Sequence, residues 1–189
     1  MKKNETKATA RLAGGNIKLG NMATFSKVYG DEVVHSQRYG DVVGTCGEHC
    51  KGCKKFCYVR RSYRYPTVID GHARNAIAFR NDLAQAFDDL DGQLTRKRRP
   101  FDVVRINQSG EIETAAELLF WVTLAKTHPE TGAFYVYTKN FSAVRALIAS
   151  IKAGYTMPQN FTVLISVWHE YGLKEFEEFK MYPFIKAFA

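Results

Sequence analysis

Residues 101–138 read FDVVRINQSGEIETAAELLFWVTLAKTHPETGAFYVYT, and this stretch contains a strand, a loop, a helix and a second strand. Residues 101–106 form an apolar run broken only by Asp102, which predicts a strand buried on both faces. Thr114 is followed three residues later by Glu117, and this capping box predicts the start of a helix. Residues 133–138 predict the next strand. This order of elements indicates two parallel strands joined by a right-handed crossover.

The same alternation continues on both sides of this stretch. Downstream, residues 141–153 predict a helix that Gly154 ends, and residues 161–168 predict another strand before a short helical tail. Upstream, the apolar periodicity predicts one helix over residues 67–90 with Gly92 as its stop. Val33-Val34 and Val42-Val43, flanked by glycines, indicate one or two short strands in residues 28–43.

These elements predict an α/β fold, either an open parallel sheet or a partial (β/α) barrel. Residues 1–20 are polar and predict a flexible N-terminal segment, and residues 21–189 predict a single domain. The most apolar stretch is too short to span a bilayer, and the N-terminus lacks the apolar region of a secretory signal. We therefore expect a cytoplasmic protein without membrane association. The net charge of +8 favours an anionic partner.

All four cysteines lie in one short segment, TCGEHCKGCKKFCY, with the spacing C-x3-C-x2-C-x3-C. Such density indicates one metal site rather than a disulfide framework, which would spread its cysteines along the chain. Zinc ribbons usually bring two distant ligand pairs together, whereas a compact loop suits a [4Fe–4S] cluster. We therefore expect a metal loop over residues 46–57 that holds a [4Fe–4S] cluster, with zinc as the alternative. The predicted ligands are Cys46, Cys50, Cys53 and Cys57.

Polar residues follow the predicted strands at residues 107–111 and 138–140 and after residue 168. The carboxyl ends of parallel strands meet at one edge of a sheet, and ligands bind there. Arg105 lies inside an apolar strand, where a guanidinium needs a partner. The sequence therefore predicts a ligand site or a buried ion pair at Arg105.

Four short motifs occur in a fixed order: Cys57-Tyr58, then Arg-Ile-x-x-Ser-Gly-Glu at 105–111, Tyr-Thr-Lys at 137–139 and Ile-Ser-Val-Trp at 165–168. This order resembles the phage gene product 88 family. It is also similar to spore photoproduct lyase and other radical S-adenosylmethionine enzymes. The resemblance covers about two thirds of the chain.

The resemblance to radical enzymes implies a partial barrel with a [4Fe–4S] cluster on three cysteines. The fourth iron would chelate S-adenosylmethionine, and reduction would cleave that cofactor to a 5′-deoxyadenosyl radical. Glu111 would lie near the cofactor's amino group, and Arg105 and Lys139 would meet a carboxylate or phosphate. If all four cysteines bind the cluster, no iron remains open. The implied cofactor-binding residues are Tyr58, Arg105, Ser109, Gly110, Glu111 and Lys139.

Two functions follow as hypotheses. The first is an iron–sulfur protein of the radical S-adenosylmethionine type that acts on nucleic acid. The alternative is a phage-encoded binding protein with a structural metal site, which engages nucleic acid or a host nucleoprotein such as a defence complex. Whether the protein is an enzyme, and its oligomeric state, stay open. The basic residues expected to contact nucleic acid are Lys54, Lys55, Arg60, Arg61, Arg64, Arg96, Arg98 and Arg99.

Overall fold

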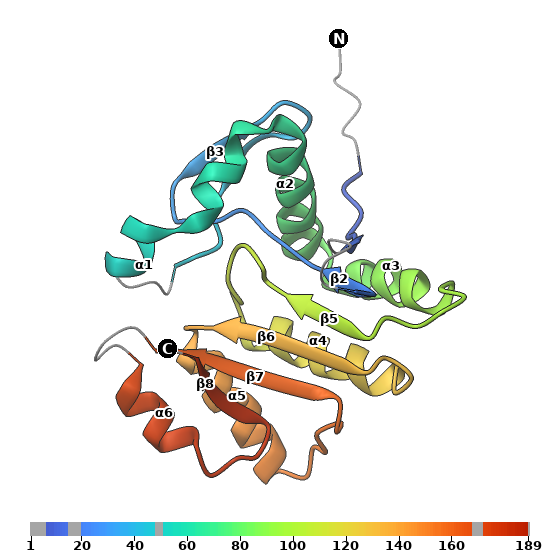
Figure 1. The fold of residues 1–189 in the computed structure, drawn as a ribbon, viewed down its shortest axis with the longest axis vertical. Helices are drawn as coiled ribbons and strands as arrows, with labels where there is room; N and C mark the ends of the chain where they lie inside the picture. Colours follow the sequence, from blue (N-terminus) through green and yellow to red (C-terminus); the bar gives the residue numbers. More distant parts are fainter. Residues whose placement is uncertain (1–6, 15–19, 48–50, 168–171, 189) are drawn as a thin grey trace.

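A computed structural model of the chain describes residues 7–14, 20–47, 51–167 and 172–188. Its main sheet has six strands in the order β1-β2-β5-β6-β7-β8 (Figure 1). Neighbouring strands from β2 to β8 pair in parallel, and β1 pairs antiparallel with β2. The strands are β1 (Ala13–Gly14), β2 (Met22–Thr24), β5 (Val103–Ile106), β6 (Ala133–Thr138), β7 (Phe161–Ser166) and β8 (Ile185–Phe188).

The sheet is open, because β1 and β8 are its two edges. The predicted open parallel sheet is therefore confirmed, and no barrel is present in the part of the chain that the structure describes. The strands from β5 to β8 follow one another in sequence without a reversal of direction. Their connections contain α4 (Ala115–Thr127), α5 (Phe141–Lys152) and α6 (Leu173–Phe179).

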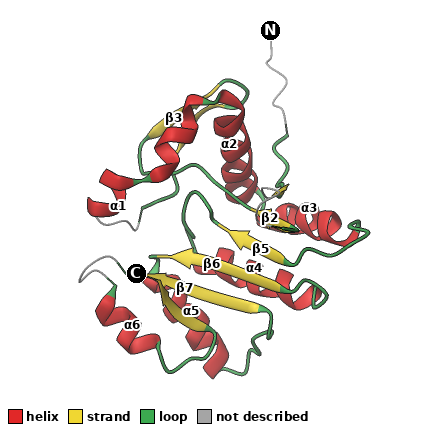
Figure 2. Cartoon of the chain, in the orientation of Figure 1, coloured by secondary structure: helices red, strands yellow, loops and turns green. Residues whose placement is uncertain are grey.

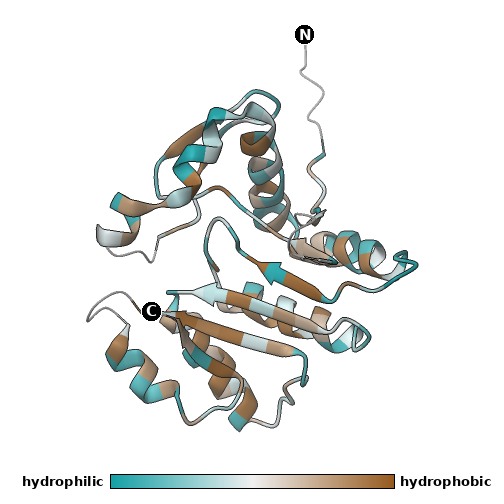
Figure 3. Ribbon diagram, in the orientation of Figure 1, coloured by the Kyte–Doolittle hydropathy of each residue, from teal (hydrophilic) through white to brown (hydrophobic). Residues whose placement is uncertain are grey.

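Helices α4 and α5 lie behind the strands in Figure 1 and bury the main core against them. In β6 the residues alternate, so that Phe134 and Val136 are buried while Tyr135 and Tyr137 are half-buried. Strand β7 is largely apolar in Figure 3 and alternates in the same way. Strand β5 also alternates, with Arg105 half-buried. The expectation that residues 101–106 are buried on both faces is therefore wrong, because the described helices of this sheet cover one face only.

A second layer of structure precedes β5 in the chain. Figure 2 shows the short hairpin and α2 above the side of the sheet that β2 and β5 form. A small apolar cluster that includes Val28, Val42, Ala73 and Ala76 joins them. The elements of this layer are β3 (Val33–Ser36), β4 (Gly40–Val43), α1 (Lys51–Phe56), the 3-10 helix η2 (Tyr58–Arg64) and α2 (Pro66–Asn81). The next helix, α3 (Leu83–Thr95), packs into the main core.

Two boundaries differ from the sequence-based expectation. The helix expected over residues 67–90 is two helices, because Asp82 leaves the helical conformation and caps α3 by accepting a hydrogen bond from the Gln85 amide at 2.9 Å. Gly92 does not end this segment but lies inside α3. The structure also adds β1 and β2, which the sequence did not predict, and β8 after the tail helix.

The described part of the N-terminal segment packs against α2 and α3. Ala10 is fully buried, and its amide donates to Asp89 at 2.9 Å. The Arg11 amide donates to Asn75 at 3.0 Å. Of residues 1–20, which the sequence predicts to be flexible, residues 1–6 and 15–19 lie outside the described part of the chain. No helix in the described ranges combines the length and apolarity needed to cross a membrane.

A buried ion pair joins the segment after β2 to α4. The Lys27 side chain is fully buried, and its Nζ lies 2.6 and 2.7 Å from the two carboxylate oxygens of Glu117. Glu113 lies 3.4 Å from the same nitrogen. Removing one partner of such a pair leaves a buried charge without compensation.

We expect Glu117→Gln to lower the free energy of unfolding by about 3 kcal/mol, because it leaves the Lys27 ammonium with only the more distant Glu113. Urea denaturation measures this loss. Glu178→Gln is the control, since it breaks the exposed ion pair with Arg145 and should change stability little. The double variant Lys27→Met/Glu117→Gln should recover much of the lost free energy of unfolding, because it no longer buries an unpaired ammonium. Equal losses for Glu117→Gln and Glu178→Gln would contradict the prediction.

Candidate functional site

A cavity of about 500 Å³ lies where the loop 107–114 and the carboxyl ends of β6, β7 and β8 meet the cysteine segment. It brings together residues that are far apart in the sequence. All of the described residues that the sequence analysis assigned to metal or cofactor binding line it. They are Cys46, Cys53, Cys57, Tyr58, Arg105, Ser109, Gly110, Glu111 and Lys139.

The three described cysteines occupy separate positions around this cavity. Cys46 follows β4, and its amide donates to the Gly30 carbonyl at 2.7 Å. Cys53 lies in α1, and Cys57 caps η2. All three are half-buried, and they also line an adjoining cavity of about 330 Å³. Cys50, the fourth predicted ligand, lies outside the described residues.

The three described cysteines do not by themselves form a metal-ligand group. In the part of the chain that the structure describes, no three His, Cys, Asp or Glu side chains lie close enough to hold a metal ion. Burial, and after it the nearby carboxylate of Glu111, raises the pKa of Cys46 to about 12. In the protein without metal this thiol is protonated at neutral pH, so metal binding would have to displace its proton.

Glu111 links the loop after β5 to the loop after β6. Its Oε1 accepts from the Ile112 amide at 2.8 Å, and its Oε2 accepts from the Lys139 amide at 2.9 Å. Burial raises the pKa of Glu111, although these hydrogen bonds and one with Thr138 oppose that shift. Both carboxylate oxygens of Glu111 therefore accept hydrogen bonds from backbone amides. Its pairing with the amino group of a cofactor stays a prediction.

Ser109 and Gly110 fix a close approach between two segments. The Ser109 hydroxyl donates to the Lys27 carbonyl at 2.9 Å. Gly110 has a φ of 83°, and a Cβ at this position would lie 2.6 Å from Thr45 Oγ1 and 2.9 Å from Lys27 Cβ. Thr45, next to Cys46, accepts from the Glu111 amide at 3.1 Å. This part of the motif therefore positions the cysteine segment above the sheet edge.

Arg105 has no carboxylate partner among the described residues. Its guanidinium lies 5.2 Å from the ring centroid of Tyr137, and its Nε is buried without a hydrogen bond. Lys139 Nζ likewise forms no ion pair with a described residue, whereas Tyr58 donates its hydroxyl to the Gln108 carbonyl. Two cationic side chains at one cavity favour a ligand that carries a carboxylate or phosphate.

Asn107 is the site residue that the sequence analysis missed. Its side chain is buried, and neither its amide nitrogen nor its amide oxygen has a hydrogen-bond partner in the described structure. Its φ of 53° is in the left-handed region, and it lines the cavity. Unpaired buried amides and strained backbone both occur preferentially at functional sites. The sequence signal was weak, because Asn107 appeared only as part of a polar loop.

The basic residues do not form one surface. Lys54 pairs with Asp31 at 2.9 Å and with Glu32 at 3.0 Å, next to the cysteine segment. Arg60, Arg61 and Arg64 lie on η2. Residues 96–99 are exposed in the connection between α3 and β5, which enters β5 at the end opposite to the cavity.

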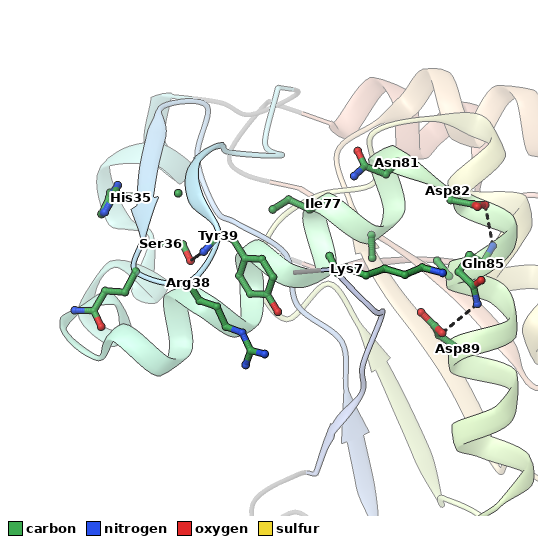
Figure 4. Close-up of a pocket in the computed structure, with 15 residues that line it drawn as sticks. Lys7, His35, Ser36, Arg38, Tyr39, Ile77, Asn81, Asp82, Gln85 and Asp89 are labelled. Atoms are coloured by element: carbon green, nitrogen blue, oxygen red, sulfur yellow. Dashed lines mark hydrogen bonds between the residues drawn. The ribbon is translucent and has the colours of Figure 1, made fainter. Parts of the chain in front are cut away.

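A larger cavity, of about 910 Å³, lies elsewhere, between the β3–β4 hairpin, α2 and α3 (Figure 4). Its acidic side chains have structural partners within it, since Asp82 caps α3 and Asp89 accepts from Gln85 at 3.3 Å. It contains no cysteine. It is therefore the weaker candidate for the predicted chemistry.

A family model described as Gene product 88 matches residues 1–181. The chain belongs to the gene product 88 family. Comparison with curated proteins and with solved structures gives no match. This match confirms the phage family that the four sequence motifs indicated. Residues from all four motifs line the cavity of about 500 Å³.

The close approach at Gly110 gives a test of how the site is built. We expect Gly110→Ala to lower the free energy of unfolding by about 2 kcal/mol or more, because a Cβ there both strains the backbone and collides with Thr45 and Lys27. Gly154→Ala is the control, since its φ of 102° also brings backbone strain but the added Cβ would meet open space. Thermal or urea denaturation measures both. A Gly110→Ala loss no larger than the Gly154→Ala loss would contradict this account.

Proposed function

We propose that this protein holds an iron–sulfur cluster on its cysteine segment and binds a small carboxylate-bearing cofactor of the S-adenosylmethionine type beside it. The observation that carries the proposal is one cavity lined by Cys46, Cys53 and Cys57 together with Arg105 and Lys139. Its volume of about 500 Å³ is in the range of small-molecule sites.

The donor set supports such a cluster on chemical grounds. Thiolates are the usual ligands of iron–sulfur clusters, and Cys50 lies in the same short segment as the three described cysteines. Three cysteine ligands would leave one iron for a cofactor, whereas four would close the cluster and favour a structural role. A cluster of the first kind, once reduced by an external electron donor, would supply the electron for reductive cleavage of the cofactor. Zinc on the same ligands remains the alternative metal.

The protein groups around the cavity support the choice of ligand. Arg105 and Lys139 would bind a carboxylate, and the unpaired donor and acceptor of Asn107 would pair with a polar group of the same ligand. Glu111 keeps the two loops that carry these residues in place. The position at the carboxyl edge of parallel strands is the usual one for ligands in α/β folds.

Metal and sulfide analysis of protein purified without oxygen tests the metal. We expect iron and sulfide near four per chain and loss of both in Cys53→Ala and Cys57→Ala, with a lower melting temperature because metal binding stabilises the fold. Zinc near one per chain without sulfide would make the site structural. A protein without metal would overturn the proposal, as would a Cys57→Ala variant that kept its metal content and melting temperature.

The cofactor is tested on the loaded protein through the spin-resonance signal of the reduced cluster. S-adenosylmethionine should change that signal, and Arg105→Gln should weaken its binding about tenfold or more, because a charged hydrogen bond contributes roughly 1.5–3 kcal/mol. Arg98→Gln, at an exposed arginine outside the cavity, should bind as the wild type does. Unchanged binding in Arg105→Gln would remove this residue from the proposal.

A second candidate is a phage-encoded binding protein with a structural metal, which engages nucleic acid or a host nucleoprotein such as a defence complex. Phe56, Tyr58 and Tyr65 are exposed by 63, 60 and 50%, and they alternate with basic side chains. Lys55 lies over Phe56 and Arg64 over Tyr65. Aromatic rings beside cationic groups are the usual platform for single-stranded nucleic acid.

For this candidate we expect salt-sensitive binding of a single-stranded oligonucleotide, measured by fluorescence anisotropy. Replacing Arg60 and Arg61 together by Gln should weaken it severalfold and reduce its salt dependence. The double variant Arg98→Gln/Arg99→Gln is the matched comparison, because it removes the same charge from the other basic stretch. Binding that depends on neither pair would contradict a nucleic-acid role for the basic residues.

A further inference from the structure

A separate cavity of about 410 Å³ lies between the N-terminal segment, η2 and α2. Arg11 comes from the N-terminal segment, and His72 and Arg74 come from α2. Its polar lining also includes the hydroxyl groups of Ser26 and Thr67, and that of Ser62, which donates to the Val59 carbonyl at 2.6 Å. Among the described residues that line it, none is Asp or Glu.

The guanidinium groups of Arg11 and Arg74 form no ion pair with a described residue. Arg74 is half-buried, and its Nε is buried without a hydrogen-bond partner. Burial lowers the pKa of Arg74, and repulsion from Arg11 and Arg38 adds to this effect, although Tyr39 opposes it. Positive charge is thus concentrated here without a counter-charge from the described chain.

The position of Arg11 is fixed by its backbone rather than by its side chain. Asn75 accepts from the Arg11 amide at 3.0 Å and donates to the Arg11 carbonyl at 3.0 Å. Asn75 follows Arg74 in α2, so this exchange brings the two guanidinium-bearing residues to the same cavity. Nearby, burial and the charge of Arg74 lower the pKa of His72 to about 4, so this ring is neutral at pH 7 and adds no further charge.

We propose that this cavity binds the phosphate group of a phosphorylated ligand, with Arg11 and Arg74 as its cationic contacts. Guanidinium groups bind phosphate oxygens through paired N–H donors, and hydroxyl groups donate to the remaining oxygens. The absence of a lining carboxylate among the described residues distinguishes it from the ion-paired surfaces of this protein.

The phosphate cavity adjoins the cysteine cavity. Tyr58, Val59, Gln108 and Ser109 line both, and the hydrogen bond from Tyr58 to the Gln108 carbonyl closes part of the shared wall. A ligand with its phosphate on Arg11 and Arg74 would carry its remaining atoms toward the cysteines. Only this last step rests on the proposed function, since the phosphate site itself requires no metal.

Isothermal titration calorimetry at constant ionic strength tests the site with three probes: a nucleoside 5′-monophosphate, the same nucleoside without phosphate, and a short single-stranded oligonucleotide. We expect a phosphate-bearing probe to bind, and Arg74→Gln and Arg11→Gln each to weaken it about tenfold. Binding of the monophosphate would indicate a nucleotide-like ligand. Binding of the oligonucleotide alone, with the same dependence on both arginines, would place a nucleic-acid phosphate there.

Controls separate this proposal from the others. Arg145→Gln, at an exposed arginine of α5 that lines neither cavity, should leave binding unchanged, and inorganic phosphate should compete with the bound probe. Arg11 is exposed, so Arg11→Gln keeps the test valid if Arg74→Gln fails to fold. Iron content should be equal in all variants. A loss of phosphate binding at unchanged iron content therefore concerns the phosphate cavity alone and not the proposed metal site. Equal binding of the nucleoside and its monophosphate, or binding indifferent to both arginine variants, would overturn the inference.

Discussion

The buried ammonium of Lys27 determines how the two layers of this protein meet. It pairs with Glu117 on α4, while the backbone of the same residue exchanges hydrogen bonds with Ser109 in the loop after β5. Glu113 connects this pair to Arg80 of α2 at 2.6 Å, and Arg80 in turn donates to the carbonyls of Val43 and Gly44 just before the cysteines. A charge taken out of water stays buried only when its partners are rigidly placed, so this contact fixes the cysteine segment relative to the sheet.

Hydrogen bonds between side chains and the backbone likewise fix the loops at the carboxyl edge of the sheet. Glu111 holds the amide of Lys139, and Asn140 donates to the carbonyl of Ile112 while its oxygen caps α5. These bonds satisfy the polar groups of two loops within the protein. Arg105 and Asn107 differ, because each retains a buried polar atom with no partner in the described structure. The contrast separates the residues whose polar groups are used to build the edge from those with a polar atom still unpaired beside the cavity.

The sequence predicted the elements whose signals are local. The strand at 133–138 and the helix that begins after Thr114 agree with the structure, where Thr114 accepts from the Glu117 amide at 3.1 Å. The role of Asp82 as a helix cap was hidden by the apolar periodicity on both sides of it. Strands β2 and β8 contain three and four residues, too few for periodicity, and long-range pairing specifies them. Strand ends and cysteine spacing predicted which candidate residues would lie together, and the described ones do line one cavity. The unpaired amide of Asn107 depends on long-range contacts that no local sequence pattern records.

The one-sided covering of the parallel sheet has a consequence for how members of this family can diverge. Phe134 and Val136 face the helices and must fit a packed core, so substitutions there change stability. Tyr135 and Tyr137 alternate with them but point to the uncovered face, and they can change without repacking that core. The two sets share one strand, yet packing constrains only the first of them closely. Substitutions on the uncovered face therefore cost less stability than substitutions on the face that the helices cover.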